Sequence, residues 1–408
     1  MLQIHELTIE NFRCIETLQV RLNARINLLI GDNGSGKTAV LDALAIGLGP
    51  IATHLPGVKG VSFKKNDLRE VDGTPMPYTR ARLSTFEGLS WTVSQSRDKS
   101  AATRKETPKA PGTKPLLAFL DREVLDPQNN GQPYILPLFA YYGVSRAVLD
   151  IPLRRKGFKK AHARFEALSE SLHAGSRFRS AFIWFYHKEN EEHRLQKEQR
   201  SFDVTLHELD AARRAITTMF PDLSEPHIEL NPLRFVVKQN GVSMALDQLS
   251  DGYQTMLGLV LDLCARFVMA NPHLDNPLAS KAVVLIDEVD LHLHPTWQHR
   301  VLGDLLRTFP NTQFVLTTHS PYIVEALNNH LKRARLGDLA SGERDAEVDA
   351  IAPLPRETVQ VYALCDGSLE NRIDDDTGLV DDTLLPIFNS INRVYDKMRD
   401  IEWNRRHA

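Results

Sequence analysis

The stretch Ile-Asn-Leu-Leu-Ile-Gly-Asp-Asn-Gly-Ser-Gly-Lys-Thr, residues 26–38, decides the fold. Its first five residues are apolar enough to form a strand that is buried on both faces. Helix-forming residues follow from Ala39 to Leu48, where Gly49-Pro50 predicts a stop. Between strand and helix, Gly31–Thr38 matches G-x-x-x-x-G-K-[ST] in full. Strand, glycine-rich loop and helix in this order predict a loop that wraps phosphate groups.

A loop of this kind binds phosphate because its backbone N–H groups approach the oxygens closely, which requires small residues, and because a helix N-terminus faces the anion. Lys37 is predicted to place its charge on the β- and γ-phosphates, and Thr38 its hydroxyl on Mg²⁺. The sequence therefore predicts binding of ATP with Mg²⁺. The predicted nucleotide-binding residues of the loop are Gly31, Asp32, Asn33, Gly34, Ser35, Gly36, Lys37 and Thr38.

A second apolar stretch, Val283–Ile286, is followed directly by Asp287 and Glu288. The carboxyl ends of parallel strands are where open α/β sheets bind ligands, and adjacent strand residues point to opposite sides. We expect Asp287 to orient Mg²⁺ or its waters and Glu288 to polarise the attacking water. Taken alone, an acidic strand end that turns into solvent is an equally good interpretation, but the phosphate loop upstream favours the catalytic one.

Two shorter patterns follow the same logic. Leu249–Gln254 opens a predicted helix, which places Ser250 and Gly252 at a positive helix N-terminus. Thr317–Pro321 closes a further apolar strand with His319. A strand-end histidine by itself is more often a structural hydrogen-bonding residue, so these two patterns count only together with the phosphate loop and the acid pair.

Outward from these motifs, the pattern predicts an α/β protein. Residues 253–327 read as helix, strand, helix, strand and helix, with helices at 253–270, 296–308 and 322–327, which indicates parallel strands joined by crossover helices. Alternating residues before the phosphate loop predict an N-terminal strand layer. Three amphipathic runs at 161–172, 178–199 and 206–220 predict a compact helical lobe.

Composition narrows the class of protein. The chain has 408 residues with 42% hydrophobic and 25% charged residues, which excludes wholesale disorder. The net charge of −3 excludes a basic surface over the whole molecule, so any nucleic-acid contact must be a local patch. We expect a soluble, cytoplasmic protein without membrane spans, for three reasons. The three cysteines are scattered, and the N-terminus does not resemble a signal peptide. The apolar run at 256–270 is broken by Asp262 and Arg266.

The order of the four motifs resembles the head of ABC-type ATPases, and Leu7–Arg13 ahead of an early phosphate loop is similar to the branch of SMC, Rad50 and RecF proteins. Three further phrases, Tyr141–Arg146, Leu249–Gln254 and Asp287–Gln298, resemble the PtuA-like ATPases of Septu and retron anti-phage systems. Such ATPases act with an HNH-type nuclease, PtuB. The resemblance extends from residue 1 to about residue 325 and more loosely over 359–402.

This resemblance implies the fold, the partners and the roles of the site residues. It implies an ABC-type head with a phosphate-loop parallel sheet, an antiparallel strand layer and an inserted helical lobe. Two protomers would share each ATP: Lys37, Thr38, Asp287, Glu288 and His319 act in cis, Ser250 and Gly252 act in trans, and Asp290 lies at the seam. The chain would also bind a PtuB-like nuclease and form an oligomer larger than a dimer. The domains expected are 1–153 and 221–335 for the head, 154–220 for the helical lobe and 336–408 for a C-terminal docking segment.

The sequence also departs from the ABC pattern. The signature carries Asp251 where transporters have glycine, and the strand ending at Tyr142-Gly143 brings no glutamine for Mg²⁺. That ligand therefore stays unassigned, and Arg146 is a candidate for a phosphate or nucleic-acid contact.

Several residue clusters have a structural interpretation that competes with a functional one. We favour interface or structural roles for the metal-like set His292, His294 and His299. We interpret the aromatic run 182–186 as the core of the helical lobe and residues 374–376 as a polar loop. We interpret the basic stretch 96–115 as a mobile loop. The run Arg154, Arg155, Lys156, Lys159 and Lys160 is either a solvated face or a DNA-phosphate contact.

Three functions remain open at this point. The first is an ATPase that senses infection and regulates a partner nuclease without being a nuclease itself. The second is a RecF- or SMC-like DNA repair clamp, whose mark would be ATP-dependent binding of duplex DNA without a partner. The third is a scaffold that binds ATP without hydrolysing it, which the intact Glu288 disfavours.

Overall fold

The computed structural model of the chain describes residues 2–147, 164–175, 178–337, 345–365, 367–380, 393 and 395–399. At its centre, the described residues form a six-stranded sheet with the order β15-β14-β3-β13-β12-β8. Neighbouring strands are parallel except β15, which is antiparallel to β14. This confirms the predicted α/β class. The strands are β3 (Ile26–Ile30), β8 (Leu138–Tyr142), β12 (Ala282–Ile286), β13 (Thr312–Thr318), β14 (Val359–Cys365) and β15 (Ser368–Asn371).

The register of three neighbouring strands brings their carboxyl ends to one edge. Ile30 of β3 pairs with Thr318 of β13, and Ile286 of β12 pairs with Leu316 of β13. Every residue of these three strands is buried, as expected for a parallel sheet covered on both faces. The segments that leave β3, β12 and β13 therefore emerge side by side.

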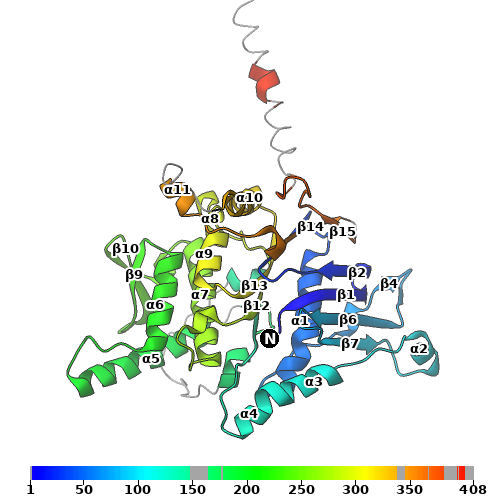
Figure 1. The fold of residues 1–408 in the computed structure, drawn as a ribbon, viewed down its shortest axis with the longest axis horizontal. Helices are drawn as coiled ribbons and strands as arrows, with labels where there is room; N and C mark the ends of the chain where they lie inside the picture. The colour runs from blue at the N-terminus through cyan, green and yellow to red at the C-terminus, as the bar shows by residue number, and fades with distance from the viewer. Residues whose placement is uncertain are drawn as a thin grey trace, which may run out of the picture.

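A second sheet is antiparallel, with the order β2-β1-β6-β7. It lies beside helix α1 (Lys37–His54), which follows the phosphate loop (Figure 1). Helix and sheet approach closely at Gly47, where an added Cβ would lie 2.1 Å from Leu83. This is the predicted N-terminal strand layer. Its strands are β1 (Ile4–Phe12), β2 (Ile15–Arg21), β6 (Tyr78–Thr85) and β7 (Ser90–Ser96).

The predicted stop of α1 at Gly49-Pro50 is wrong, because the helix continues through Pro50 to His54. An interior proline removes one helical hydrogen bond and costs about 3 kcal/mol in an exposed helix. Here the last turn buries Ile51 and Ala52 completely or nearly so. The free energy gained by burying these apolar side chains offsets the hydrogen bond that Pro50 cannot make. Local helix propensity does not include this burial, so the sequence pattern alone predicted a stop.

Helix α7 (Asp251–Ala270) runs through the middle of the molecule, with α9 (Val301–Thr308) and α10 (Pro321–Leu336) nearby (Figure 1). Among the described helices, α7 alone has the length and hydropathy of a membrane span, and 83% of that window is buried inside the protein. The core helix of a globular domain passes the same test, so this finding is weak evidence for a membrane.

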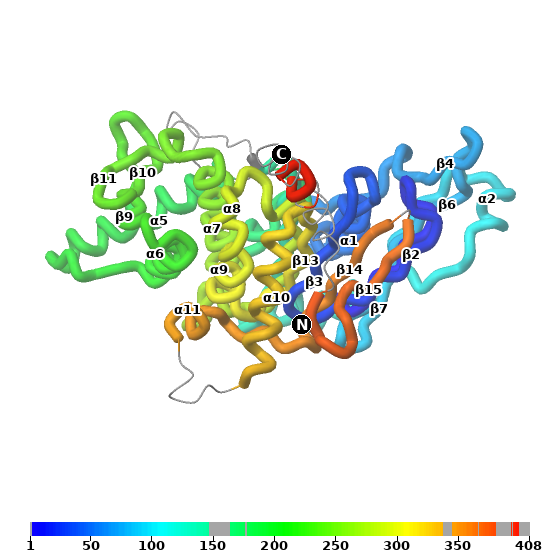
Figure 2. The backbone as a smooth tube through the Cα atoms, turned by 90° about the horizontal axis from the view of Figure 1, so that it is seen from above, coloured from blue at the N-terminus to red at the C-terminus, as the bar shows by residue number. Residues whose placement is uncertain are grey.

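A helical hairpin and a small sheet form the end of the molecule opposite the antiparallel layer (Figure 2). The hairpin consists of α5 (Phe178–Gln199) and α6 (His207–Met219), close to the predicted helices. Phe182, Trp184 and Phe185 are buried, which confirms the aromatic run as core. The small sheet has the order β11-β10-β9, with β9 (Leu223–Leu230), β10 (Leu233–Gln239) and β11 (Val242–Ala245).

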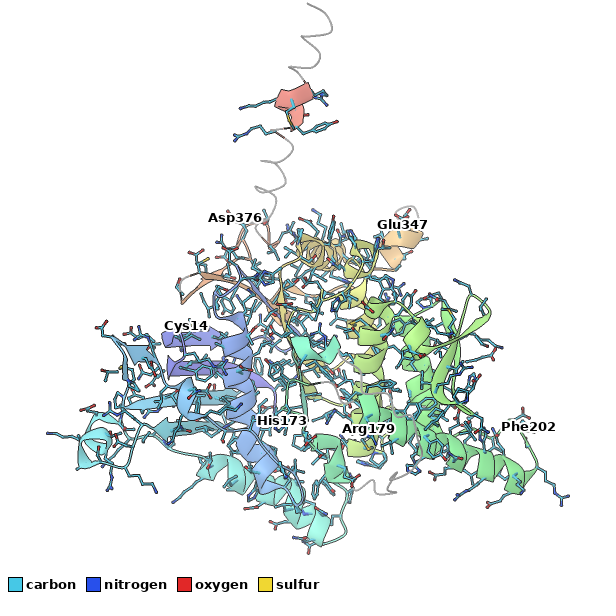
Figure 3. The ribbon with its side chains drawn as sticks, turned by 180° about the vertical axis from the view of Figure 1, so that it is seen from behind. Cys14, His173, Arg179, Phe202, Glu347 and Asp376 are labelled. Carbon is cyan, nitrogen blue, oxygen red and sulfur yellow. The ribbon has the colours of Figure 1, made fainter. Side chains whose placement is uncertain are left out.

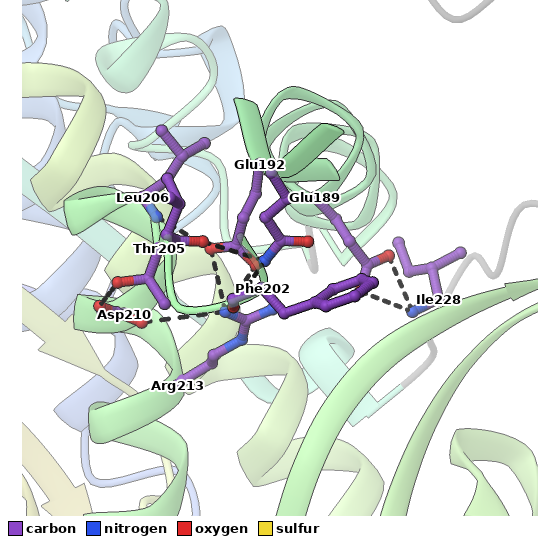
Figure 4. Close-up of polar contacts among 10 residues, drawn as sticks. Glu189, Glu192, Phe202, Thr205, Leu206, Asp210, Arg213 and Ile228 are labelled. Atoms are coloured by element: carbon purple, nitrogen blue, oxygen red, sulfur yellow. Dashed lines mark hydrogen bonds and ion pairs between the residues drawn. The ribbon is translucent and has the colours of Figure 1, made fainter. Parts of the chain in front are cut away.

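Two buried glutamates of α5 tie the hairpin together (Figure 4). Glu192 accepts hydrogen bonds from the backbone N–H of Leu206, at 2.9 Å, and from Arg213 of α6, at 2.9 Å. Glu189 accepts from the backbone N–H of Ile228 on β9, at 3.1 Å, and burial raises the pKa of its carboxyl. At the tip of the hairpin, the side chain of Phe202 extends into solvent (Figure 3).

Three further predictions of local structure need correction. The stretch 96–115 contains helix α2 (Ala101–Glu106), capped by Ser100. The described part of the predicted helix 161–172 is only a 3₁₀ turn at Arg164–Leu168, because the following residues lie along the edge of β8. The predicted helix 296–308 is split into α8 (Pro295–Gln298) and α9.

The remaining elements are short. The residue triplet 374–376 lies in a turn, in which Asp374 accepts from the N–H of Thr377. Most of the predicted helix 382–402 and all of 154–160 lie outside the described residues. The division into four domains stays a prediction. The short elements are β4 (Glu70–Val71), β5 (Thr74–Pro75), α3 (Lys114–Leu120), α4 (Asp126–Asn129) and α11 (Ala346–Asp349).

Candidate functional site

The loop between β3 and α1 has the backbone of a phosphate-binding loop. Gly31, Gly34 and Gly36 have φ angles of 145°, 82° and 104°, a region that disfavours residues with a side chain. At Gly31 an added Cβ would also lie 2.6 Å from the carbonyl oxygen of Leu364 on β14. The glycines are therefore required both by conformation and by the close approach of a neighbouring strand.

Lys37 folds back onto this loop. Its ammonium donates to the carbonyl oxygens of Gly31, at 2.9 Å, and Asp32, at 2.8 Å, and only 6% of the residue is exposed. Burial lowers the pKa of Lys37, while the carboxylates of Asp287 and Glu288 act in the opposite direction. The hydroxyl of Ser35 is buried and has no hydrogen-bond partner in the described part of the chain. An unpartnered buried hydroxyl within the loop fits a site that receives phosphate oxygens.

Asp287 connects the loop to the central sheet. Its carboxylate accepts from the hydroxyl of Thr38, at 2.8 Å, and from the hydroxyl of Thr317 at the end of β13, at 2.6 Å. The residue is 2% exposed. A threonine hydroxyl beside a carboxylate is the set of hard oxygen ligands that Mg²⁺ prefers. The residues present therefore fit a magnesium ion bound between Thr38 and Asp287.

Glu288 follows in an unusual backbone conformation, with φ of 47°. Its N–H donates to the hydroxyl of Thr317, at 2.7 Å, and its carbonyl oxygen accepts from Arg146, at 2.6 Å. The residue is half-buried, so its side chain is neither locked in the core nor fully in water. Asp290, two residues further along the chain, accepts from the hydroxyl of Thr318.

His319 directly follows β13, between the ends of β3 and β12. It is half-buried, and within the described residues its ring has no hydrogen bond. The structure thus brings five predicted residues to one edge of the central sheet. We call this set the catalytic edge: Lys37, Thr38, Asp287, Glu288 and His319.

Ser250 and Gly252 lie elsewhere, at the start of α7. Ser250 is exposed, and its side chain makes no capping hydrogen bond. An added Cβ at Gly252 would lie 2.7 Å from the carbonyl oxygen of His292, so the helix start and the segment 291–294 are in close contact. Together they line an open pocket of 590 Å³, which we call the signature pocket. Its lining residues are Ser250, Asp251, Gly252, Tyr253, His292, Leu293, His294 and Trp297.

An aromatic cluster supports the floor of the signature pocket. The rings of Tyr253 and Trp297 meet edge to face at 4.4 Å, and Phe220 packs against both. The Tyr253 hydroxyl donates to Asp222, and burial together with this carboxylate raises the pKa of Tyr253 to about 12. The tyrosine is therefore a fixed neutral donor at neutral pH.

The three histidines do not form a metal site. His294 caps helix α8 through its Nδ1, and His299 packs against the ring of Tyr322. In the part of the chain that the structure describes, no three histidines, cysteines or acids are grouped to hold a metal ion. His292 lines the signature pocket, and the interface or structural role of the three histidines stays a prediction.

Two residues that hold the catalytic edge were missed or misjudged from sequence. The Thr317 hydroxyl donates to the carboxylate of Asp287 and accepts from the backbone N–H of Glu288. The sequence feature that could have indicated this role is the polar end of an otherwise apolar strand. Arg146, predicted to contact phosphate or nucleic acid, is 2% exposed and donates to the carbonyl oxygens of Asp287 and Glu288. The choice of Arg146 as a candidate for a phosphate or nucleic-acid contact is therefore wrong.

A glycine-rich phosphate loop and a strand-end acid pair joined by a Thr38–Asp287 hydrogen bond define a nucleoside-triphosphatase of the P-loop class. The sequence profile of the AAA domain matches residues 6–223, more than half of the chain, and a second AAA-domain profile matches residues 144–325. The chain belongs to the AAA-domain family. Within it, the chain is similar to the "DNA double-strand break repair Rad50 ATPase" of Thermococcus kodakarensis, with 38% identity over 18% of this chain and 8% of that protein.

Its relatives include proteins named for retron and Septu systems. "Retron Vc95 probable ATPase" of Vibrio cholerae is 28% identical over 74% of this chain and 67% of its own length. "Septu protein PtuA" of Bacillus thuringiensis is 23% identical over 98% of this chain and 90% of its own length. Among solved structures, an Smc head domain from Pyrococcus furiosus is 14% identical over 96% of this chain and 100% of its own, with a TM-score of 0.45.

Proposed function

We propose that two copies of this chain hydrolyse ATP to ADP and phosphate at shared sites, and that this turnover regulates a partner nuclease in cytoplasmic anti-phage defence. The observation that carries the shared site is the separation of the catalytic edge from the signature pocket. The residues that line the signature pocket include none from the phosphate loop. An exposed serine at a helix N-terminus can instead receive a phosphate held by another copy.

The catalytic edge supplies the chemistry in this proposal. The Lys37 ammonium exchanges the carbonyl oxygens of its own loop for phosphate oxygens, which provides charge without moving the backbone. Thr38 and Asp287 would hold Mg²⁺, which would supply positive charge to the β- and γ-phosphates. Glu288 accepts a proton from the attacking water as a general base. His319, directly after β13, contacts the γ-phosphate.

The second copy completes the site. Ser250 and the N–H groups at the start of α7 donate to the γ-phosphate from the opposite side, and Asp290 lies at the contact between the copies. Gly252 is needed because a side chain there would meet the carbonyl oxygen of His292. Hydrolysis then depends on dimer formation, so the rate of ATP hydrolysis rises when two copies assemble.

The link to a nuclease is supported by the resemblance to PtuA-like ATPases and by relatives named for retron and Septu systems. The proposed partner is an HNH-type, PtuB-like nuclease. The chain itself is proposed to lack nuclease activity. A nucleic-acid contact through the basic run at 154–160 is part of the same proposal, and that run lies outside the described residues.

A complementation experiment tests the shared site. Ser250→Arg blocks the signature pocket, and Lys37→Ala removes the phosphate-loop cation, so each variant alone is expected to be inactive. When the two are mixed, some mixed dimers keep one intact composite site, and part of the hydrolysis should return. Failure to regain activity, with mixed dimers demonstrated by tagged copies, would show that each chain hydrolyses ATP alone.

A reconstitution experiment tests the division of labour. The purified chain should leave DNA and RNA intact with ATP and either Mg²⁺ or Mn²⁺, and cutting should require an added HNH-type, PtuB-like nuclease. The repair-clamp alternative predicts instead ATP-dependent binding of duplex DNA by the chain alone. The scaffold alternative predicts ATP binding without phosphate release.

A further inference from the structure

Arg146 lies directly beneath the acid pair, although it is far from it in sequence. Its guanidinium donates to the carbonyl oxygens of Asp287 and Glu288, the latter at 2.6 Å, and to that of Gly143, at 3.1 Å. The Nε of Arg146 is buried and has no hydrogen-bond partner among the described residues. Burial lowers the pKa of Arg146 to about 10, so the group remains a cation at neutral pH.

The backbone that Arg146 holds is a strained one. Glu288 has φ of 47°, in the left-handed region, which costs a residue with a side chain roughly 1 kcal/mol or more. Such a conformation persists only where its surroundings fix it. Thr317 fixes it from the β13 side through the Glu288 N–H, and Arg146 fixes it from the β8 side through two successive carbonyl oxygens.

Arg146 is itself held by a close contact between two chain segments. The N–H of Gly143 donates to the carbonyl oxygen of Ala174, at 2.9 Å, and the Ser145 hydroxyl donates to the same oxygen, at 3.1 Å. An added Cβ at Gly143 would lie 2.6 Å from the Cβ of Ala174. Only glycine permits this approach, so the position of the Arg146 segment depends on residues 171–174, which precede the helical hairpin.

We infer that Arg146 is a positioning residue for hydrolysis: it sets the backbone of Asp287 and Glu288 so that the Glu288 carboxylate faces the attacking water. This inference rests on the proposed role of Glu288 as general base. Arg146 does not touch the nucleotide in this arrangement. Its removal should therefore lower turnover and leave the phosphate loop, and with it ATP affinity, unchanged.

Arginine at this position is not replaceable by a single point charge. A guanidinium holds its N–H donors in one plane at fixed angles, which matches two successive carbonyl oxygens, whereas a lysine ammonium is a compact charge on a flexible stem and does not fix that geometry. Because the acceptors are backbone carbonyl oxygens and not carboxylates, the matching of geometry matters here more than the charge.

The experiment compares kcat and the ATP dissociation constant in Arg146→Ala, Arg146→Lys and Gly143→Ala. We expect kcat to fall about 10²-fold in Arg146→Ala and about tenfold in the other two, because small displacements of a catalytic group have effects of this size. ATP affinity should stay within about threefold of wild type. Free guanidinium ion, below denaturing concentrations, should restore part of the activity of Arg146→Ala and none of that of Gly143→Ala.

Arg164→Lys is the matched control. Arg164 also donates from its guanidinium to backbone carbonyl oxygens, those of Ala270 and Tyr134, both at 2.8 Å, but away from the acid pair. It should keep wild-type kcat. If Arg146→Ala does not fold, Arg146→Lys carries the test.

Three results would overturn the inference: wild-type kcat in Arg146→Lys, an equal loss in Arg164→Lys, or a loss of ATP affinity that matches the loss of kcat. A parallel Glu288→Gln preparation separates this inference from the proposed function. If Glu288→Gln keeps wild-type turnover, the general base is wrong. If it loses turnover while Arg146→Lys keeps it, only the role of Arg146 is wrong.

Discussion

The catalytic edge and the signature pocket differ in how far their polar groups are satisfied within one chain. At the catalytic edge, Lys37 and Asp287 are buried and each makes two hydrogen bonds to neighbouring residues. At the signature pocket, Ser250 is exposed and its hydroxyl caps no N–H group. The first region is organised before any ligand arrives, whereas the second presents donors to the outside.

This difference follows from the cost of burying charge. A buried carboxylate or ammonium without partners is strongly unfavourable, so the chain must supply partners for the catalytic edge as it folds. A neutral serine and a helix N-terminus that are exposed to water do not have the cost of a buried charge. They can therefore remain without a partner until a phosphate binds. We therefore expect changes at the catalytic edge to affect chemistry or folding, and changes at the signature pocket to affect assembly.

The largest effect is expected at Glu288, the proposed general base. Glu288→Gln should lower turnover about 10³-fold, because an amide cannot accept the proton, while ATP affinity stays unchanged. Phosphate release and equilibrium ATP binding are measured on the same preparation. Glu357→Gln, an exposed glutamate on another segment, is the control and should behave as wild type. Turnover near the wild-type rate would remove Glu288 from the mechanism.

A smaller but distinct effect is expected at the signature pocket. Gly252→Val places its side chain against the carbonyl oxygen of His292 and should lower hydrolysis about 10²-fold by displacing the trans donors. Unlike the phosphate-loop variant Lys37→Ala, it should still bind ATP. Sedimentation with ATP measures the accompanying loss of dimer. Wild-type hydrolysis in this variant would break the comparison between the two regions.

Thr317 offers an isosteric test within the catalytic edge. Thr317→Val removes the hydroxyl that donates to Asp287 and accepts from the Glu288 N–H, and should cost about 1–3 kcal/mol of stability and roughly tenfold in kcat. Thr312→Val on the same strand is the matched control. The buried hydroxyl of Thr312 has no partner among the described residues, so this change should be neutral or stabilising. Denaturant unfolding measures the stability of both variants, and phosphate release measures their kcat. Equal stability and equal kcat in the two variants would contradict this prediction.

The smallest effect concerns pH and lies outside both regions. His330 of α10 is buried and bonds the carbonyl oxygen of Ala352, and burial lowers the pKa of its ring below 6.5, with nearby Arg307 acting in the same direction. Below pH about 6.5 the unfolded chain therefore binds more protons, so stability is complete above that pH and is lost as the pH falls.

The measurement is the melting temperature between pH 7.5 and 5.5 for wild type and His330→Asn, which keeps a donor for Ala352. The variant should lose less stability on acidification than wild type, by at most about 1.4 kcal/mol per pH unit. Hydrolysis at pH 7.5 should be unaffected. Parallel melting curves would show that His330 does not titrate in this window.

Much of the fold could be read from local patterns because each pattern is satisfied within a few residues. The strand at 26–30 and the helix at 178–199 agree with the structure to the residue. Predictions failed where distant segments decide the outcome. Helix α1 passes Pro50 because its last turn is buried, and residues 169–174 leave the helical pattern because they hydrogen-bond to the edge of β8.

The sequence by itself determined the phosphate loop and the acid pair, because glycine conformation and strand-end placement are properties of short segments. The tertiary structure alone decided that Thr38 meets Asp287, that Thr317 and Arg146 fix the backbone of Glu288, and that Ser250 lies in a separate pocket. Those contacts join residues up to 249 positions apart. A buried arginine and a surface arginine look the same in sequence, since the burial and the carbonyl oxygens that distinguish them come from strands packed side by side only in the folded chain.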